Sequence, residues 1–87
     1  MKILFICTGN TCRSCMAEAI FNKICKLEDY FSFSAGVNVL TNSVTSKNSF
    51  KLIAEKLNID ISERCAIQLD ETLIKEVDLV LAMSKSA

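Results

Sequence analysis

The sequence contains no histidine and no proline, and its charges of opposite sign cancel to a net charge of zero. Without histidine and without repeated C-x-x-C pairs, a zinc site has too few ligands, so we expect no metal and no other cofactor. No basic block indicates a nucleic-acid partner. No apolar run approaches the ~20 residues of a membrane span, and residues 1–7 are too short for a signal-peptide core. Neither nucleic acid nor a membrane is therefore an expected partner.

The five cysteines are an odd number and show no disulfide framework. Cys12 and Cys15 form one C-x-x-C, but the arginine between them does not fit a thioredoxin-like motif. Free thiols are typical of a reducing compartment, so we expect a cytoplasmic protein. The chain is 51% hydrophobic, which is apolar for 87 residues. Either its core is well filled or some apolar surface is covered by something else.

Hydrophobic periodicity predicts alternating strands and helices. Strands are expected at residues 2–7, 30–36 and 78–83. A first helix is expected to follow Ser14 as its N-cap, and a second to end near Leu57 after a cap at Thr45 or Ser46. A short third helix should follow Asp70. This order predicts an α/β fold with a parallel sheet and right-handed crossovers, in which ligands bind beyond the carboxyl ends of the strands.

The stretch after the first strand, "CTGNTCRS", has the composition of an anion-binding loop. Residues 8–13 offer consecutive backbone N–H groups, and Gly9 and Asn10 tolerate the positive φ that turns these groups inward. The helix that follows adds its free N–H groups, and Arg13 can bind two phosphate oxygens with its planar fork. The spacing therefore predicts a site for a tetrahedral dianion.

Cys7 lies at the centre of this loop, where the same positive field stabilises a thiolate. The Ser14 hydroxyl can donate a hydrogen bond to the sulfur. A thiolate beneath a phosphoryl group is placed for in-line attack, which would give a phosphocysteine that water hydrolyses. The alternative is an ordinary buried thiol at the end of a strand. The Gly-Asn pair, the Arg-Ser pair and the flanking strand and helix favour the catalytic interpretation.

The motif "CTGNTCRS" resembles the phosphate loop of the low-molecular-weight protein tyrosine phosphatases, in the bacterial branch that includes protein arginine phosphatases. The likeness extends to "MAEAIF", to "SAGV" at residues 34–37 and to "DLVLAMSKS" at residues 78–86. It implies a three-layer α/β fold with strand order 2-1-3 and flanking helices, in a single partial domain of residues 1–87. It also implies that Cys7 is the nucleophile, Arg13 the phosphate clamp and Ser14 the thiolate stabiliser. The phosphate cradle that it implies consists of Thr8, Gly9, Asn10, Thr11 and Cys12.

The resemblance also bears on specificity and oxidation. Threonine at position 11 goes with phosphoarginine in the family, whereas a bulky aliphatic residue goes with phosphotyrosine, so Thr11 favours a phosphoarginine protein substrate. Cys12 matches a cysteine that can form a reversible disulfide with the nucleophile, Cys7, although it can equally be a small loop residue. Cys15 stands where the family has proline. Arsenate reductases share the fold but need two more cysteines near the third strand, and "DLVLAMSKSA" has none.

Family members continue through a further helix, a fourth strand and an Asp-Pro loop that supplies the general acid. This sequence has no Asp-Pro, and Glu18, Asp70 and Asp78 are poor substitutes, so we expect catalysis to be impaired by ~10²–10⁴-fold. Without the further elements, the first and third strands should expose apolar surface, and the chain should self-associate. The alternatives to a phosphatase are a phosphate-binding pseudo-phosphatase and an inactive fragment.

Overall fold

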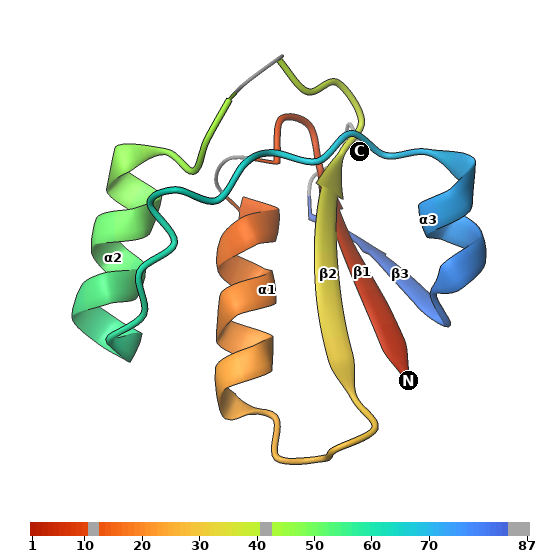
Figure 1. Cartoon of the computed structure of the whole chain (residues 1–87), viewed down its shortest axis with the longest axis horizontal. Helices are drawn as coiled ribbons and strands as arrows, with labels where there is room; N and C mark the ends of the chain where they lie inside the picture. The colour runs from red at the N-terminus through yellow and green to blue at the C-terminus, as the bar shows by residue number, and fades with distance from the viewer. Residues whose placement is uncertain (11–12, 41–42, 84–87) are drawn as a thin grey trace.

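The computed structural model describes residues 1–10, 13–40 and 43–83. Its three strands form one parallel sheet in the order β2-β1-β3, which confirms the predicted topology (Figure 1). The elements follow one another along the chain as β1 (Lys2–Cys7), α1 (Arg13–Ile24), β2 (Phe31–Gly36), α2 (Lys47–Leu57), α3 (Glu71–Glu76) and β3 (Leu79–Ala82).

The register of the sheet assigns each strand residue to one of two faces. Leu4 lies opposite Phe33 and Ile6 opposite Ala35, so these side chains share a face, which packs against Leu73 and neighbouring residues of the α3 region. The other face carries Phe5, whose ring meets Phe21 of α1 edge-on. Figure 1 shows α1 on one side of the sheet and α3 on the other, with α2 packed outside α1. The predicted three-layer arrangement is therefore confirmed.

Local capping signals explain two of the three helix starts. The Ser46 side chain accepts from the Ser49 N–H at the start of α2, and the Asp70 carboxylate accepts from the Leu73 N–H at the start of α3. The N-cap prediction for Ser14 is wrong, because α1 already begins at Arg13. The hydroxyl of Ser14 has other partners, which are described below.

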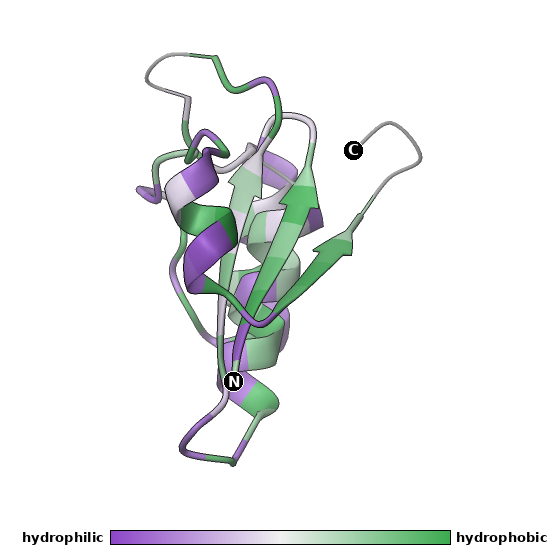
Figure 2. Cartoon of the chain, turned by 90° about the vertical axis from the view of Figure 1, so that its right-hand side faces the viewer, coloured by the Kyte–Doolittle hydropathy of each residue, from purple (hydrophilic) through white to green (hydrophobic). Residues whose placement is uncertain are grey.

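The exposure of the sheet differs between its central and edge strands. The expectation that β1 exposes apolar surface is wrong, because β1 lies between two strands and its Leu4 is fully buried. The expectation is correct for β3, an edge strand in which Leu79, Val80 and Leu81 are each 41% exposed. In Figure 2 this strand stands out as an apolar ribbon at the side of the sheet. Within the described residues, no helix is long and apolar enough to cross a membrane.

Candidate active site

The candidate site lies at the carboxyl ends of β1 and β2, where two chain segments meet the loop after Cys7. The N–H groups of Val37 and Asn38 donate to the carbonyls of Cys7 and Thr8. A Cβ atom at Gly36 would lie 2.7 Å from the Thr8 carbonyl oxygen and 2.9 Å from the Asn10 nitrogen. Only glycine permits this close approach, so Gly36 sets the distance between β2 and the loop.

The Cys7 sulfur is buried at the head of the loop and is surrounded by hydrogen-bond donors. It lies 2.8 Å from the Ser14 hydroxyl oxygen and accepts from the Asn10 N–H at 3.2 Å. Burial raises the pKa of the Cys7 thiol, but the Ser14 side chain and the N–H groups of Ser14, Asn10 and Gly9 together outweigh it and lower the pKa below its ordinary value. These hydrogen bonds therefore stabilise the thiolate relative to the thiol, which is the direction that a nucleophilic role requires.

Asn10 organises the loop through its backbone and its side chain. It is fully buried and adopts the left-handed conformation with φ 55°. Of the two residues expected to tolerate positive φ, Asn10 adopts it and Gly9 does not. The Asn10 Nδ2 donates to the Ser14 Oγ at 2.7 Å, and its Oδ1 accepts from the Ile67 N–H at 2.8 Å. The hydrogen bonds of the Ser14 hydroxyl to Cys7 and Asn10 explain why it does not cap α1.

Arg13 is exposed and lies at the first residue of α1, at the mouth of the loop. Its Nη1 donates to the carbonyl oxygen of Met83, just beyond β3, at 3.3 Å. The other N–H groups of the guanidinium are able to donate to an anion at the same time. The contact with Met83 does not test the clamp role of Arg13, which stays a prediction. Thr11 and Cys12 lie outside the described residues, so their cradle, specificity and disulfide roles also stay predictions.

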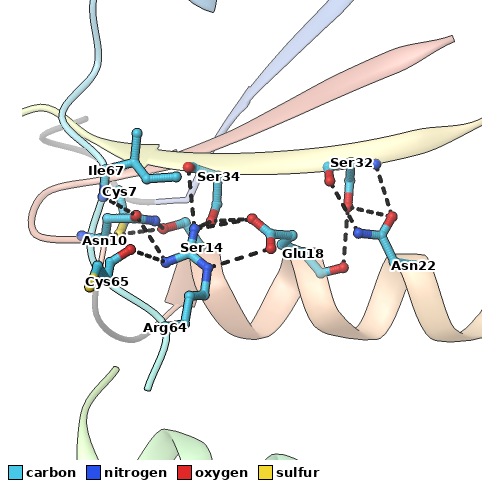
Figure 3. Close-up of polar contacts among 10 residues, drawn as sticks. All are labelled: Cys7, Asn10, Ser14, Glu18, Asn22, Ser32, Ser34, Arg64, Cys65 and Ile67. Carbon is cyan, nitrogen blue, oxygen red and sulfur yellow. Dashed lines mark hydrogen bonds and ion pairs between the residues drawn. The ribbon is translucent and has the colours of Figure 1, made fainter. Parts of the chain in front are cut away.

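No sequence motif contains Arg64, yet its side chain joins the loop to both α1 and β2 (Figure 3). Its Nη1 donates to the Asn10 Oδ1 at 3.1 Å, and its Nη2 donates to a Glu18 carboxylate oxygen at 3.1 Å and to the Ser34 hydroxyl. Glu18 also accepts from the Ser34 hydroxyl at 2.7 Å. Arg64 lies 54 positions from Asn10 in a segment without regular structure, so no local pattern connects the two.

The three carboxylates considered as general acids all have other partners. Glu18 forms an ion pair with Arg64, and Asp70 caps α3. Asp78 accepts from the Lys2 N–H at 2.7 Å, beside the first residue of β1 and therefore at the opposite end of the strand from Cys7. Their interpretation as poor substitutes for a catalytic acid agrees with this geometry. The described residues contain no cluster of three metal-ligating acids or cysteines.

Comparison with known proteins gives consistent matches over nearly the whole chain. The protein-arginine-phosphatase of Bacillus subtilis (strain 168) is 41% identical over 86 residues, which are 97% of this chain and 56% of that protein. An arsenate reductase of Staphylococcus xylosus is 38% identical over 85 residues, which are 98% of this chain and 61% of that protein.

A crystal structure of a low molecular weight protein tyrosine phosphatase from T. tengcongensis superposes with a TM-score of 0.91 at 44% identity. The match covers 99% of this chain and 60% of that one, so the chain spans little more than half the length of the relatives that it matches. The family model for low molecular weight phosphotyrosine protein phosphatases matches residues 2–87. On this evidence, the chain belongs to the low molecular weight phosphotyrosine protein phosphatase family.

Proposed function

We propose that this chain is a cysteine-dependent phosphatase that acts on phosphorylated protein side chains. The observation that carries the proposal is the Cys7 sulfur, which is buried beside the start of α1 and hydrogen-bonded by Ser14 and Asn10. A thiolate held in this way, at the head of an amide-rich loop, is suited to attack a bound phosphoryl group. Residues 1–87 act as one domain in this proposal, because all three strands share a single sheet.

The proposed reaction has two steps. The Cys7 thiolate attacks phosphorus, and a sulfur–phosphorus bond forms while the bond to the leaving oxygen or nitrogen breaks. The leaving group departs with the bonding electron pair and takes a proton from solvent or from an acid. Water then attacks the phosphocysteine, which releases inorganic phosphate and a proton and restores the thiolate. Arg13 and the loop N–H groups hold the phosphoryl oxygens in both steps.

The substrate class that we favour is phosphoarginine in proteins, with phosphotyrosine as the alternative. The support is Thr11 in the loop together with the 41% identity to the protein-arginine-phosphatase of Bacillus subtilis. The test replaces Thr11 with isoleucine and compares turnover of matched phosphoarginine and phosphotyrosine peptides. We expect the preference to move towards phosphotyrosine. An unchanged ratio of kcat/KM for the two peptides would contradict the assignment of Thr11 as the specificity residue.

Proton delivery to the leaving group is expected to limit the rate. Glu18, Asp70 and Asp78 are committed to other contacts, so we propose that turnover is fastest for leaving groups that need little protonation. Loss of general-acid assistance typically costs ~10²–10⁴-fold. Rates measured across aryl phosphates of increasing leaving-group pKa should fall steeply, whereas a flat dependence would show that an acid operates.

The primary experiment compares wild type, Cys7→Ser and Cys25→Ser with para-nitrophenyl phosphate as substrate. Wild type and Cys25→Ser should turn over the substrate, because Cys25 lies just beyond the end of α1, away from the loop. Cys7→Ser should show none. Rapid acid quenching of wild type should leave one phosphoryl group on the peptide that contains Cys7, detected by mass spectrometry.

A phosphate-binding protein without catalysis is the second candidate, favoured by the engagement of the three carboxylates described above. Calorimetric titration with vanadate separates the two candidates. Binding of vanadate by a wild type whose turnover does not exceed that of Cys7→Ser would support the binding protein and exclude the enzyme. Neither binding nor turnover would leave an inactive fragment.

We also propose that the chain self-associates through β3, whose apolar side chains are exposed at the edge of the sheet. Sedimentation velocity of wild type should show larger species as concentration rises. Leu81→Lys should remain monomeric, whereas Leu27→Lys, in the turn between α1 and β2, should behave as wild type. A wild type that is monomeric at every concentration would contradict this proposal.

A further inference from the structure

Arg64 donates to the Asn10 side chain, Asn10 donates to Ser14, and the Ser14 hydroxyl contacts the sulfur of Cys7. We propose that Arg64 is a positioning residue, which fixes the direction of this chain of hydrogen bonds so that it ends with a proton donated to the sulfur. The inference rests on the proposed function only in taking the Cys7 thiolate as the reactive group.

The direction of this series of hydrogen bonds follows from which of its groups can donate and which can accept. A guanidinium and a backbone N–H can only donate, so the Asn10 atom that faces both Arg64 and Ile67 is the amide oxygen. The amide nitrogen of Asn10 therefore faces the Ser14 Oγ at 2.7 Å, and it can only donate. Ser14 must accept this bond. Its single hydrogen is then free to point to the Cys7 sulfur, 2.8 Å away.

The opposite orientation of the amide would have the opposite effect on the thiolate. With the Asn10 amide turned over, its NH₂ group would meet two other donors, from Arg64 and Ile67. Its oxygen would then accept the Ser14 hydrogen, which would be lost to the sulfur. Each of the two donors disfavours this orientation, so removal of Arg64 should weaken the preference without abolishing it.

Arg64 is itself held in place from two layers of the fold. Its Nε and Nη2 donate to the two carboxylate oxygens of Glu18 on α1 at 3.4 and 3.1 Å, and its Nη2 also donates to the Ser34 hydroxyl on β2. With the Nε edge of the fork turned to Glu18, the remaining nitrogen, Nη1, points to Asn10 (Figure 3). The Arg64 and Glu18 side chains are only 15% and 23% exposed, so solvent screens this pair less than a surface pair.

The test measures the pH dependence of alkylation at Cys7 by iodoacetamide, with peptide mapping to separate Cys7 from the other thiols. In Arg64→Met the midpoint of the profile should move to higher pH. The rate below the midpoint should fall by at most about threefold to tenfold, the size of one net hydrogen bond, because Ile67 still orients the amide. Arg64→Lys keeps a charged donor without the planar fork, so its midpoint should move less. Lys51→Met removes a positive charge from the exposed surface of α2 and should not move the midpoint.

A double-mutant cycle with Ser14→Ala separates positioning from simple charge attraction. Without the hydroxyl there is no hydrogen to orient, so Arg64→Met should cause no further shift in the Ser14→Ala background. An equal shift in both backgrounds would show that Arg64 acts by its charge alone and would overturn the proposal. An unmoved midpoint in folded Arg64→Met would also overturn it.

Should Arg64→Met fail to fold, the decision passes to Arg64→Lys, where an unmoved midpoint is the contradicting result. This readout does not depend on phosphatase turnover. A moved midpoint in a protein that cannot hydrolyse para-nitrophenyl phosphate would retain the role of Arg64 and reject the proposed function. Turnover by a protein whose Cys7 midpoint does not change when Arg64 is replaced would retain the proposed function and reject the role of Arg64.

Discussion

Substitution of Gly36 by alanine should displace the loop that follows Cys7. The added Cβ would lie 2.7 Å from the Thr8 carbonyl oxygen, 2.8 Å from a Val39 methyl group and 2.9 Å from the Asn10 nitrogen. All three distances are shorter than real Cβ contacts, and two of them involve backbone that cannot turn away. Gly36 is also held by hydrogen bonds to Ile67 and Leu69, so the strand has little freedom to retreat.

The expected loss of stability is about 1–3 kcal/mol, the typical cost of overpacking a filled site. A domain of this size has about 4–13 kcal/mol of total stability, so Gly36→Ala should still fold at low temperature. The larger effect should fall on the loop. Displacement of the Asn10 N–H removes a hydrogen bond from the Cys7 sulfur, so the pKa of the thiol should rise and vanadate should bind more weakly.

Urea denaturation, vanadate calorimetry and the alkylation profile of Cys7 together test this prediction. The matched control is the double variant Gly36→Ala with Val39→Ala, which removes the side-chain contact and leaves the two backbone contacts. We expect it to recover part of the stability and little of the vanadate affinity. Full recovery of both would show that the contact with Val39, and not the approach of the loop, made Gly36 necessary.

Three further perturbations follow from the same geometry. Ser14→Ala should raise the pKa of the Cys7 thiol and slow its alkylation at low pH, whereas Ser32→Ala, which removes another buried hydroxyl, should leave the alkylation profile unchanged. The pKa of Cys7 is lower in the folded state than in the unfolded state, so urea melts should show that stability relative to Cys7→Ala rises with pH until the ordinary thiol value of ~8.5 is passed. A pH-independent difference would argue against a native thiolate. Asp70→Ala should cost about 0.5–2 kcal/mol by urea denaturation, since the Leu73 N–H loses its cap.

Those parts of the fold that depend on local sequence were predictable. The apolar run of β1 and the alternation in β2 indicated strands, and the cap at Asp70 marks a helix start that needs only its own neighbourhood. The N-cap prediction for Ser14 is wrong because it relied on the local pattern alone. A serine before an apolar helical pattern indicates a cap, but here the hydroxyl is bound by two groups of the loop, Cys7 and Asn10, and the helix starts without it.

The candidate site divides in the same way between local and distant contributions. The positions of Cys7 and Ser14 at the loop follow from one short motif, whereas Arg64 reaches the loop only through the tertiary fold. A signal for Arg64 was nevertheless present. Glu18 and Ser34 lie on facing elements, and polar groups that are buried between elements need partners. The sequence has two arginines, and Arg13 is assigned to the phosphate, so Arg64 was the other arginine able to bind such a cluster with a fork. A search for partners of the polar groups between the expected layers would therefore have identified Arg64, although no motif contains it.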